Sequence, residues 1–405
     1  MHGNKYDPHN RAGRLKTSIR KLKEGEYDVN PENAKVLLAF HRDIMTEGLS
    51  TSRVSKLMET LLRIGRMIEK PFEDLTKDDI KDFLIDLEGT KLSEWTKHDY
   101  KVAFRRLFKW MKGGNTQYPP EVSWIKVHVR NRNRLPDELL SEEELKSMVA
   151  QCCNPRDRAF LECLFETGCR ISELLTVQNK NVKFDAYGAL MVVDGKTGMR
   201  RIRIVASVPS LANWLEHHPV REDPEAYIFV KTRHGTEQLP FRYEYALKIV
   251  KRCAEKAGIR KRIHPHLFRH SRATILANRL TEAQMKEYFG WVQASDMAGI
   301  YVHMSGRDVD DAILRLHGIK GEEPEKKKVF RPVSCVRCKS ENSPSSRFCT
   351  KCGCSLDMKV AMEAEGKDKS RDEIFSMLMK DPEFQGMILK KLAESNKEET
   401  VEVLQ

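Results

Sequence analysis

The chain has 405 residues, of which 40% are hydrophobic and 8% aromatic, so it can build packed cores and is not wholly disordered. At about 150 residues per domain, this length predicts two to three domains. Lysine and arginine (71) outnumber aspartate and glutamate (59), which gives a formal net charge of +12. This surplus favours a polyanionic partner, such as a nucleic acid.

The same composition predicts where the protein works. The sequence has no run of about 18 apolar residues, so we expect no membrane span and no membrane partner. Residues 1–23 lack the apolar core of a secretory signal. Of the ten cysteines, five fall between positions 335 and 354, and the others are single or, at Cys152 and Cys153, adjacent. This usage is typical of a reducing compartment and predicts a cytoplasmic, nucleoid-associated protein.

The N-terminal third reads as helical after a basic start. Residues 1–27 are rich in lysine and arginine and predict a basic arm that can lie along a phosphate backbone; a solvated leader is the alternative. Residues 28–114 contain four stretches with helical spacing of apolar side chains. One of them opens on a capping-box pattern at Thr76 and Asp79, and the last ends at Gly113. These features predict a small all-helical domain.

A second, mixed domain follows a linker at 115–137 that is rich in Pro, Asn and Arg. The segment 138–318 opens on a capping-box pattern at Ser141 and Glu144. Alternation around a Gly-Lys-Thr-Gly turn predicts a β-hairpin at 189–205. We expect a further short strand at 227–230, a helix pair at 156–178 and later helices at 243–258, 264–279, 281–290 and 308–318. The predicted fold class is mainly α with a small antiparallel β-sheet.

Beyond this domain the sequence predicts a charged linker at 319–332, a cysteine-rich segment at 333–357 and a charged helical tail at 358–405. Two Cys-x-x-Cys pairs flank a short polar loop, so they can present four thiolates tetrahedrally to a structural Zn²⁺ ion. The four predicted ligands are Cys335, Cys338, Cys349 and Cys352. A segment this small needs a metal to hold it together, and it resembles zinc ribbons. Cys354 is not expected as a ligand, and no ribbon partner can be assigned.

Several residues in the second domain suit phosphate chemistry. His266, Arg269 and His270 stand at i, i+3 and i+4, so a helix would place them on one face. Arginine binds phosphate oxygens in a bidentate way and histidine moves protons. Arg170 follows Gly168 at the start of an apolar helix, where an anion is favoured. Taken singly, such a histidine and arginine triplet is more often a surface cluster, and for Arg170 an ion pair to a nearby acid such as Glu173 is favoured.

The remaining candidates are Lys196, at the tip of the predicted hairpin, and Trp291 and Tyr301 near the end of the domain. A lysine at a hairpin tip is usually only solvated, and a single tyrosine is usually structural. Tyr288 and Tyr227 are alternatives to Tyr301 as a nucleophile.

In chain order, these residues resemble the catalytic set of the tyrosine recombinase family, which includes phage integrases and Xer-like proteins. The resemblance spans residues 28–318 and is carried by three motifs: TGCRISELL, HPHLFRH, and FGW followed by IYVH. The sequence around the tyrosine is similar to that of archaeal members. It implies an N-terminal DNA-clamping domain (the core-binding, SAM-like domain) at 28–114 and an α+β catalytic domain at 138–318. The implied catalytic residues are Arg170, Lys196, His266, Arg269, Trp291 and Tyr301, with His270 in support.

The resemblance implies a mechanism. Tyr301 attacks a DNA phosphodiester, forms a 3′-phosphotyrosyl bond and releases a 5′-hydroxyl, so neither ATP nor a metal is needed. Arg170 and Arg269 neutralise the non-bridging oxygens. Lys196 protonates the leaving oxygen, and His266 accepts the tyrosine proton.

Trp291 stands where many family members have histidine. An indole donates one N–H and cannot move a proton, so its expected role is hydrogen bonding or packing. His270 is expected to support His266.

The implied partner is double-stranded DNA, bound by a homo-tetramer on paired sites. In the family a helix after the tyrosine docks into a neighbouring protomer, and here the apolar positions of 308–318 fit such a helix or an ordinary core element. A type IB topoisomerase or telomere resolvase is an alternative, and relaxation of supercoils without strand exchange would favour it. A non-catalytic zinc-ribbon DNA-binding factor is another, but it leaves the ordered catalytic residues unexplained.

Overall fold

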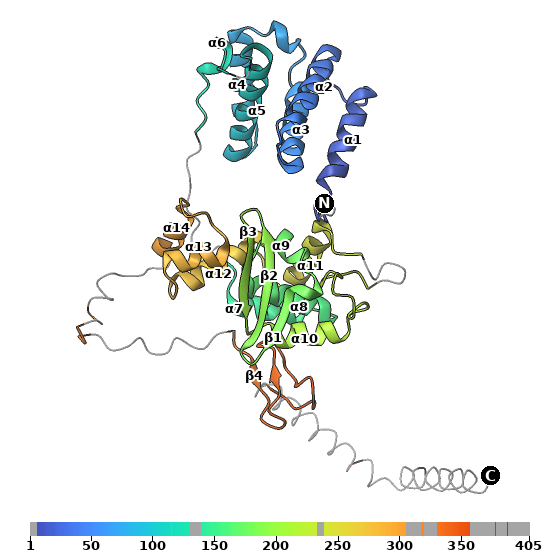
Figure 1. Cartoon of the computed structure of the whole chain (residues 1–405), viewed down its shortest axis with the longest axis vertical. Coiled ribbons are helices and arrows are strands. Elements are labelled where there is room, and N and C mark those ends of the chain that lie inside the picture. Colours follow the sequence, from blue (N-terminus) through green and yellow to red (C-terminus); the bar gives the residue numbers. More distant parts are fainter. Residues whose placement is uncertain are drawn as a thin grey trace, which may run out of the picture. The chain divides into compact units, whose positions relative to one another are not determined.

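The computed structural model describes residues 6–114, 116–128, 139–232, 239–304, 314, 317–319, 330–356, 377 and 387. The chain forms two compact units (Figure 1): unit 1 comprises Met1–Glu138 with Leu239–Ala246, and unit 2 comprises Leu139–Gln238 with Leu247–Gln405. The predicted fold class is confirmed, because helices dominate and the sheets are small and antiparallel. No helix in these described ranges is both long and apolar enough to span a bilayer.

Unit 1 is helical. Its helices share one hydrophobic core, in which Phe40, Phe72 and Phe104 are fully buried. The capping box predicted at Thr76 and Asp79 is present and begins one of them. The elements are α1 (Arg11–Lys23), α2 (Pro31–Thr46), α3 (Thr51–Gly65), the short η1 (Phe72–Asp74), α4 (Lys77–Gly89), α5 (Glu94–Lys112) and α6 (Pro120–Ser123).

Helix α1 differs from the expected basic arm. Its side chains Leu15 and Leu22 are buried in the core of unit 1, and Ile19 packs against that core. The three residues stand at i, i+4 and i+7, so they form an apolar stripe on one face. The surrounding lysines and arginines obscure this stripe in the sequence, although they occupy the remaining faces of the same helix.

Unit 2 contains the predicted β-hairpin. Strands β2 (Gly188–Gly195) and β3 (Gly198–Ile204) pair antiparallel with Gly195 opposite Gly198, and β1 (Val182–Asp185) adds a third strand that was not predicted. The other elements are α7 (Glu142–Ala150), α8 (Pro155–Thr167), α9 (Ile171–Leu175), η3 (Asn179–Asn181), α10 (Val208–Glu216), α11 (Tyr243–Lys256), α12 (Pro265–Ala277), α13 (Glu282–Phe289) and α14 (Met297–Met304). The first residues of α11 belong to unit 1.

The prediction of a strand at 227–230 is wrong. Only an isolated bridge joins Tyr227 to Gln178. The Ile228 N–H donates to the Val177 carbonyl, and the Ile228 carbonyl accepts from the Trp214 indole. These buried backbone groups are therefore satisfied without a neighbouring strand, while the apolar side chains still fill the core.

The cysteine-rich segment folds against the body of unit 2. Its strands β4 (Val333–Ser334) and β5 (Glu341–Asn342) pair antiparallel. Phe330 packs on Phe165 of α8 with ring centroids 5.4 Å apart, and the hydroxyls of Ser343 and Ser345 donate to the buried Glu162 carboxylate. Apart from 314, 317–318, 377 and 387, the segments expected to be helical at 308–318 and within 358–405 lie outside the described residues.

Replacing Leu22 with alanine should lower the free energy of unfolding of unit 1 by about 2 to 4 kcal/mol, because a buried leucine in α1 leaves a cavity when truncated. Denaturant unfolding of the parent and variant measures the difference. Lys23→Ala is the matched control, since Lys23 is exposed on the same helix. Equal stability of the two variants would mean that α1 does not pack on the core.

Candidate active site

The first arginine of the site lies where α8 gives way to α9. Gly168 caps the C-terminus of α8 with a left-handed φ of 53°, and a Cβ there would come within 2.8 Å of the Phe289 ring. Glycine therefore permits both the turn and the close packing. Arg170 follows as the residue before α9, and its Nη1 donates to Glu173 Oε1 at 2.7 Å. The Arg170 side chain keeps 30% exposure, so the ion pair leaves part of its guanidinium accessible.

The second arginine lies beside the first. Arg269 on α12 is 6% exposed, and its Nη1 and Nη2 donate to the carbonyls of Gly168 at 3.0 Å and Phe289 at 2.7 Å. Burial, followed by the positive charge of nearby Arg170, lowers the pKa of Arg269 to about 10. Arg269 still carries its charge at neutral pH. Two guanidinium groups thus occupy one region, although 99 positions of sequence separate them.

The tyrosine meets this region from α14. Tyr301 is 3% exposed, and its hydroxyl shares a short hydrogen bond with His270 Nδ1. Its ring stacks on Trp291, with centroids 5.5 Å apart and planes 3° from parallel. Trp291 in turn lies beneath Arg269, whose Cζ is 5.5 Å from the indole centroid. The phenol, the imidazole, the indole and a guanidinium therefore form one cluster.

His266 lies one turn before His270 on α12, with the two ring centroids 6.4 Å apart. It is exposed, whereas His270 is partly buried against the tyrosine. The shared helix face that the i, i+4 spacing predicted is therefore present.

The hairpin loop brings Lys196 to the same side of the unit. Lys196 is exposed at the turn between β2 and β3. The next residue, Thr197, donates its hydroxyl to the Gly290 carbonyl at 3.0 Å. Because Trp291 follows Gly290 directly, this bond ties the lysine loop to the segment that carries the indole.

Two residues of the cluster were not among the predicted site residues. Glu173 accepts from Arg170 and, at 2.7 Å, from Arg200 Nη2 on β3. Burial raises the pKa of Glu173, but the hydrogen bonds and charges of Arg200 and Arg170 outweigh it and hold that pKa below its ordinary value. Strand alternation was the available signal for Arg200, since it shares a face with the buried Ile202 and Ile204.

The alternative tyrosines have other surroundings. The Tyr288 hydroxyl donates to the Glu166 carbonyl at 2.9 Å, and burial raises the pKa of Tyr288. Tyr227 lies beside Gln178 through a backbone bridge. The partner of His270 Nδ1 in the cluster is instead the Tyr301 hydroxyl.

The cysteine-rich segment brings four thiols together. The Sγ atoms of Cys335, Cys338, Cys349 and Cys352 all lie within 4.8 Å of one another. Closest are Cys338 with Cys349 at 3.5 Å and Cys335 with Cys352 at 3.6 Å. Such a set of soft sulfur ligands fits a tetrahedral metal ion, so the cluster could hold zinc. Cys354 is outside the set.

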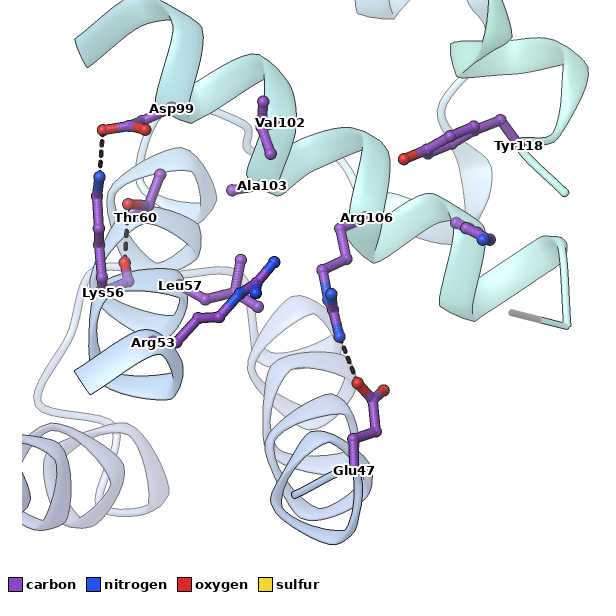
Figure 2. A pocket seen from close by; sticks show the side chains of 11 residues that line it. Glu47, Arg53, Lys56, Leu57, Thr60, Asp99, Val102, Ala103, Arg106 and Tyr118 are labelled. Carbon is purple, nitrogen blue, oxygen red and sulfur yellow. Dashed lines mark hydrogen bonds and ion pairs between the residues drawn. The ribbon is translucent and has the colours of Figure 1, made fainter. Parts of the chain in front are cut away.

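Unit 1 carries a separate groove between α3 and α5, with a cavity volume of about 600 Å³. Figure 2 shows basic side chains from both helices along it. Lys56 pairs with Asp99 at 2.6 Å, and Arg106 pairs with Glu47. Arg53 has no ion pair with any residue in the described ranges. We call this the basic groove; its basic residues are Arg53, Lys56, Arg106 and Lys109.

The second unit of the chain is similar to known recombinase sequences. Residues 138–307 match the model of the phage integrase family, and this range contains every predicted catalytic residue. A tyrosine recombinase of Pseudothermotoga lettingae is 26% identical over 257 residues, which cover 62% of this chain and 86% of the relative. The tyrosine recombinase XerC of Staphylococcus aureus strain JH9 is 30% identical over 209 residues, covering 49% of this chain and 67% of the relative.

Solved structures share the fold. The XerH site-specific recombinase bound to palindromic difH substrate superposes with a TM-score of 0.53 at 19% identity, covering 78% of this chain and 98% of that chain. A lambda integrase tetramer bound to a Holliday junction gives a TM-score of 0.54 at 16% identity, covering 68% and 78%. These likenesses concern the fold. The XerC relative, together with the family match, shows that this chain belongs to the phage integrase family of tyrosine recombinases.

Proposed function

We propose that the chain is a site-specific DNA recombinase that cuts and rejoins DNA through a 3′-phosphotyrosyl intermediate. The observation that carries this proposal is the cluster in which Arg170 and Arg269 lie together while Tyr301 is held by Trp291 and His270. Guanidinium groups placed in advance stabilise the charge that builds on a phosphate during attack. The phenol of Tyr301 supplies the nucleophile in this proposal.

The steps follow from these positions. Tyr301 Oη attacks the phosphorus of a DNA phosphodiester, the bond from phosphorus to the 5′-oxygen breaks, and the phosphoryl group passes to the tyrosine. Arg170, partly exposed, and Arg269, held by two carbonyls, bind the non-bridging oxygens. Lys196 protonates the leaving 5′-oxygen from its exposed loop. Reversal with a new 5′-hydroxyl rejoins the strand.

His270 and His266 have different roles in this proposal. His270 holds the tyrosine hydroxyl before DNA binds, as its hydrogen bond suggests. His266, exposed on the same helix face, accepts the tyrosine proton during attack. Trp291 supports the phenol by stacking, and its indole packs against the phosphate.

Unit 1 supplies the clamp on the duplex in this proposal, with the basic groove as its contact with the phosphate backbone. The helical body carries the role that we assigned to 28–114, and α1 extends that body toward the N-terminus. In the same proposal, residues 138–318 form the catalytic domain. We also propose a homo-tetramer on paired sites, as in the lambda integrase assembly on a Holliday junction.

In the same proposal, 333–357 is a zinc ribbon. Cys335, Cys338, Cys349 and Cys352 would hold a structural Zn²⁺ ion, because their sulfur atoms already converge. A bound zinc would supply the cross-link that so small a segment needs and would take no part in strand cleavage.

Tyr301→Phe should abolish the covalent adduct with a suicide DNA substrate, because it removes the hydroxyl that bonds to His270 Nδ1 and that attacks the phosphate in this proposal. Denaturing gels of protein cross-linked to labelled DNA measure the adduct. Tyr288→Phe is the control and should keep it. Adduct formation by Tyr301→Phe would exclude this assignment, and supercoil relaxation without strand exchange by the parent would favour the topoisomerase alternative.

Arg53→Ala in the basic groove should weaken duplex binding and reduce the salt dependence by about one counterion, as expected for a lost phosphate contact. Fluorescence anisotropy over a range of salt concentrations measures both quantities. Lys81→Ala on α4 removes an exposed charge outside the groove and should change neither. An unchanged salt slope for Arg53→Ala would remove the groove from the DNA contact.

Metal analysis of the purified chain should find roughly one zinc per chain, the stoichiometry of a closed four-cysteine site. Cys349→Ser should lose the metal, since three thiolates remain, while Cys354→Ser should retain it. Chelation should leave the rest of unit 2 folded by circular dichroism. Zinc retained by Cys349→Ser, or lost from Cys354→Ser, would contradict the ligand assignment.

A further inference from the structure

Arg200 lies on β3, where strand pairing sets it opposite Val193. Its side chain is only 9% exposed, which is unusual for an arginine. The neighbouring Arg201 faces the other side of the strand and is exposed. Burying a guanidinium is costly unless its donors find partners, so the contacts of Arg200 indicate what it does.

Those contacts join separate segments of the site. Arg200 Nη2 donates to Glu173 Oε2 at 2.7 Å, and Glu173 is also the partner of Arg170. Arg200 Nε donates to the Tyr288 carbonyl at 2.9 Å, three residues before Trp291. Arg200 itself stands four residues after Lys196 on the same hairpin. One side chain thus bonds to the segments that carry the first arginine and the indole, and it belongs to the segment that carries the lysine.

Two glycines leave the space that this arrangement needs. A Cβ on Gly290 would lie 3.0 Å from Arg200 Nη1 and 3.2 Å from its Cδ, and Gly290 also has a left-handed φ of 60°. A Cβ on Gly195 would overlap Glu173 Oε1 and lie 3.2 Å from Arg200 Nη1. Both glycines adjoin a predicted catalytic residue, Trp291 and Lys196 respectively. The Glu173–Arg200 pair therefore fills the space between the β2–β3 turn at Gly195 and the turn at Gly290.

We propose that Arg200 is a positioning residue that holds the Lys196 hairpin, the start of α9 at Arg170 and the Gly290–Trp291 corner in one arrangement. This inference rests on the proposed function for its consequence in catalysis. Arg200 does not need to touch the DNA: it acts through Glu173 and through the Tyr288 carbonyl. The Thr197–Gly290 hydrogen bond then closes the hairpin against the same corner.

The test compares Arg200→Gln with Arg201→Gln, which removes an exposed charge from the other face of the same strand. Adduct formation with a suicide DNA substrate is followed in a single turnover at saturating protein, so that affinity does not limit the rate. Arg200→Gln should slow the adduct at least about tenfold, since small displacements of catalytic groups are costly. DNA affinity should remain within about threefold, because a side chain that is 9% exposed offers little of its guanidinium to a phosphate.

Hydrogen exchange on the same proteins separates positioning from a direct role. Peptides covering 195–198 and 289–291 should exchange faster in Arg200→Gln than in Arg201→Gln. Arg200→Lys keeps the charge without the planar fork and should recover part of the rate. If Arg200→Gln does not fold, as judged by thermal unfolding, adduct formation and hydrogen exchange are both measured on Arg200→Lys instead.

The inference is overturned if Arg200→Gln keeps the parental adduct rate, or if its rate falls while exchange in both peptides stays as in the control. A parent protein that forms no adduct would instead refute the proposed function. In that case the exchange comparison alone decides whether Arg200 holds the three segments together.

Discussion

A buried carboxylate with two arginine partners organises the site. Glu173 accepts from Arg170, which precedes its helix, and from Arg200 on the sheet, and its pKa stays below the ordinary value although burial opposes this. With Arg269 nearby, three guanidinium groups surround one carboxylate, so the region keeps a positive charge. This is the electrostatic requirement for receiving a phosphate whose negative charge grows during the reaction.

The proposed nucleophile, Tyr301, is held by a different interaction. Tyr301 belongs to a small hydrophobic cluster with Phe289, Met285 and Ala273, so its ring is placed by packing. The stack of Phe289, Trp291 and Tyr301 also lies against Arg269 through the first two rings. The same aromatic rings thus pack against Tyr301 and contact the Arg269 guanidinium. The indole of Trp291 fits a stacking role, which needs no proton transfer.

The features that could be predicted from the sequence are local ones, which depend on interactions between residues close together in the chain. The capping boxes at Thr76 and Ser141 and the hairpin turn after Gly195 were predicted and are present, because each depends on residues a few positions apart. Prediction from the sequence failed where local pattern and tertiary context disagree. The apolar stripe of α1 was hidden by basic residues, and the segment at 227–230 reads as a strand but meets no second strand.

The sequence by itself determined the helical character, the cysteine spacing and the order of the candidate catalytic residues, since these follow from residue type and separation along the chain. Only the tertiary structure decided that Glu173 links Arg170 to Arg200 and that His270 meets Tyr301. It also decided that the cysteine-rich segment packs on α8 through Glu162. Such contacts join residues far apart in the chain, and their energies depend on burial and orientation, which no local pattern specifies.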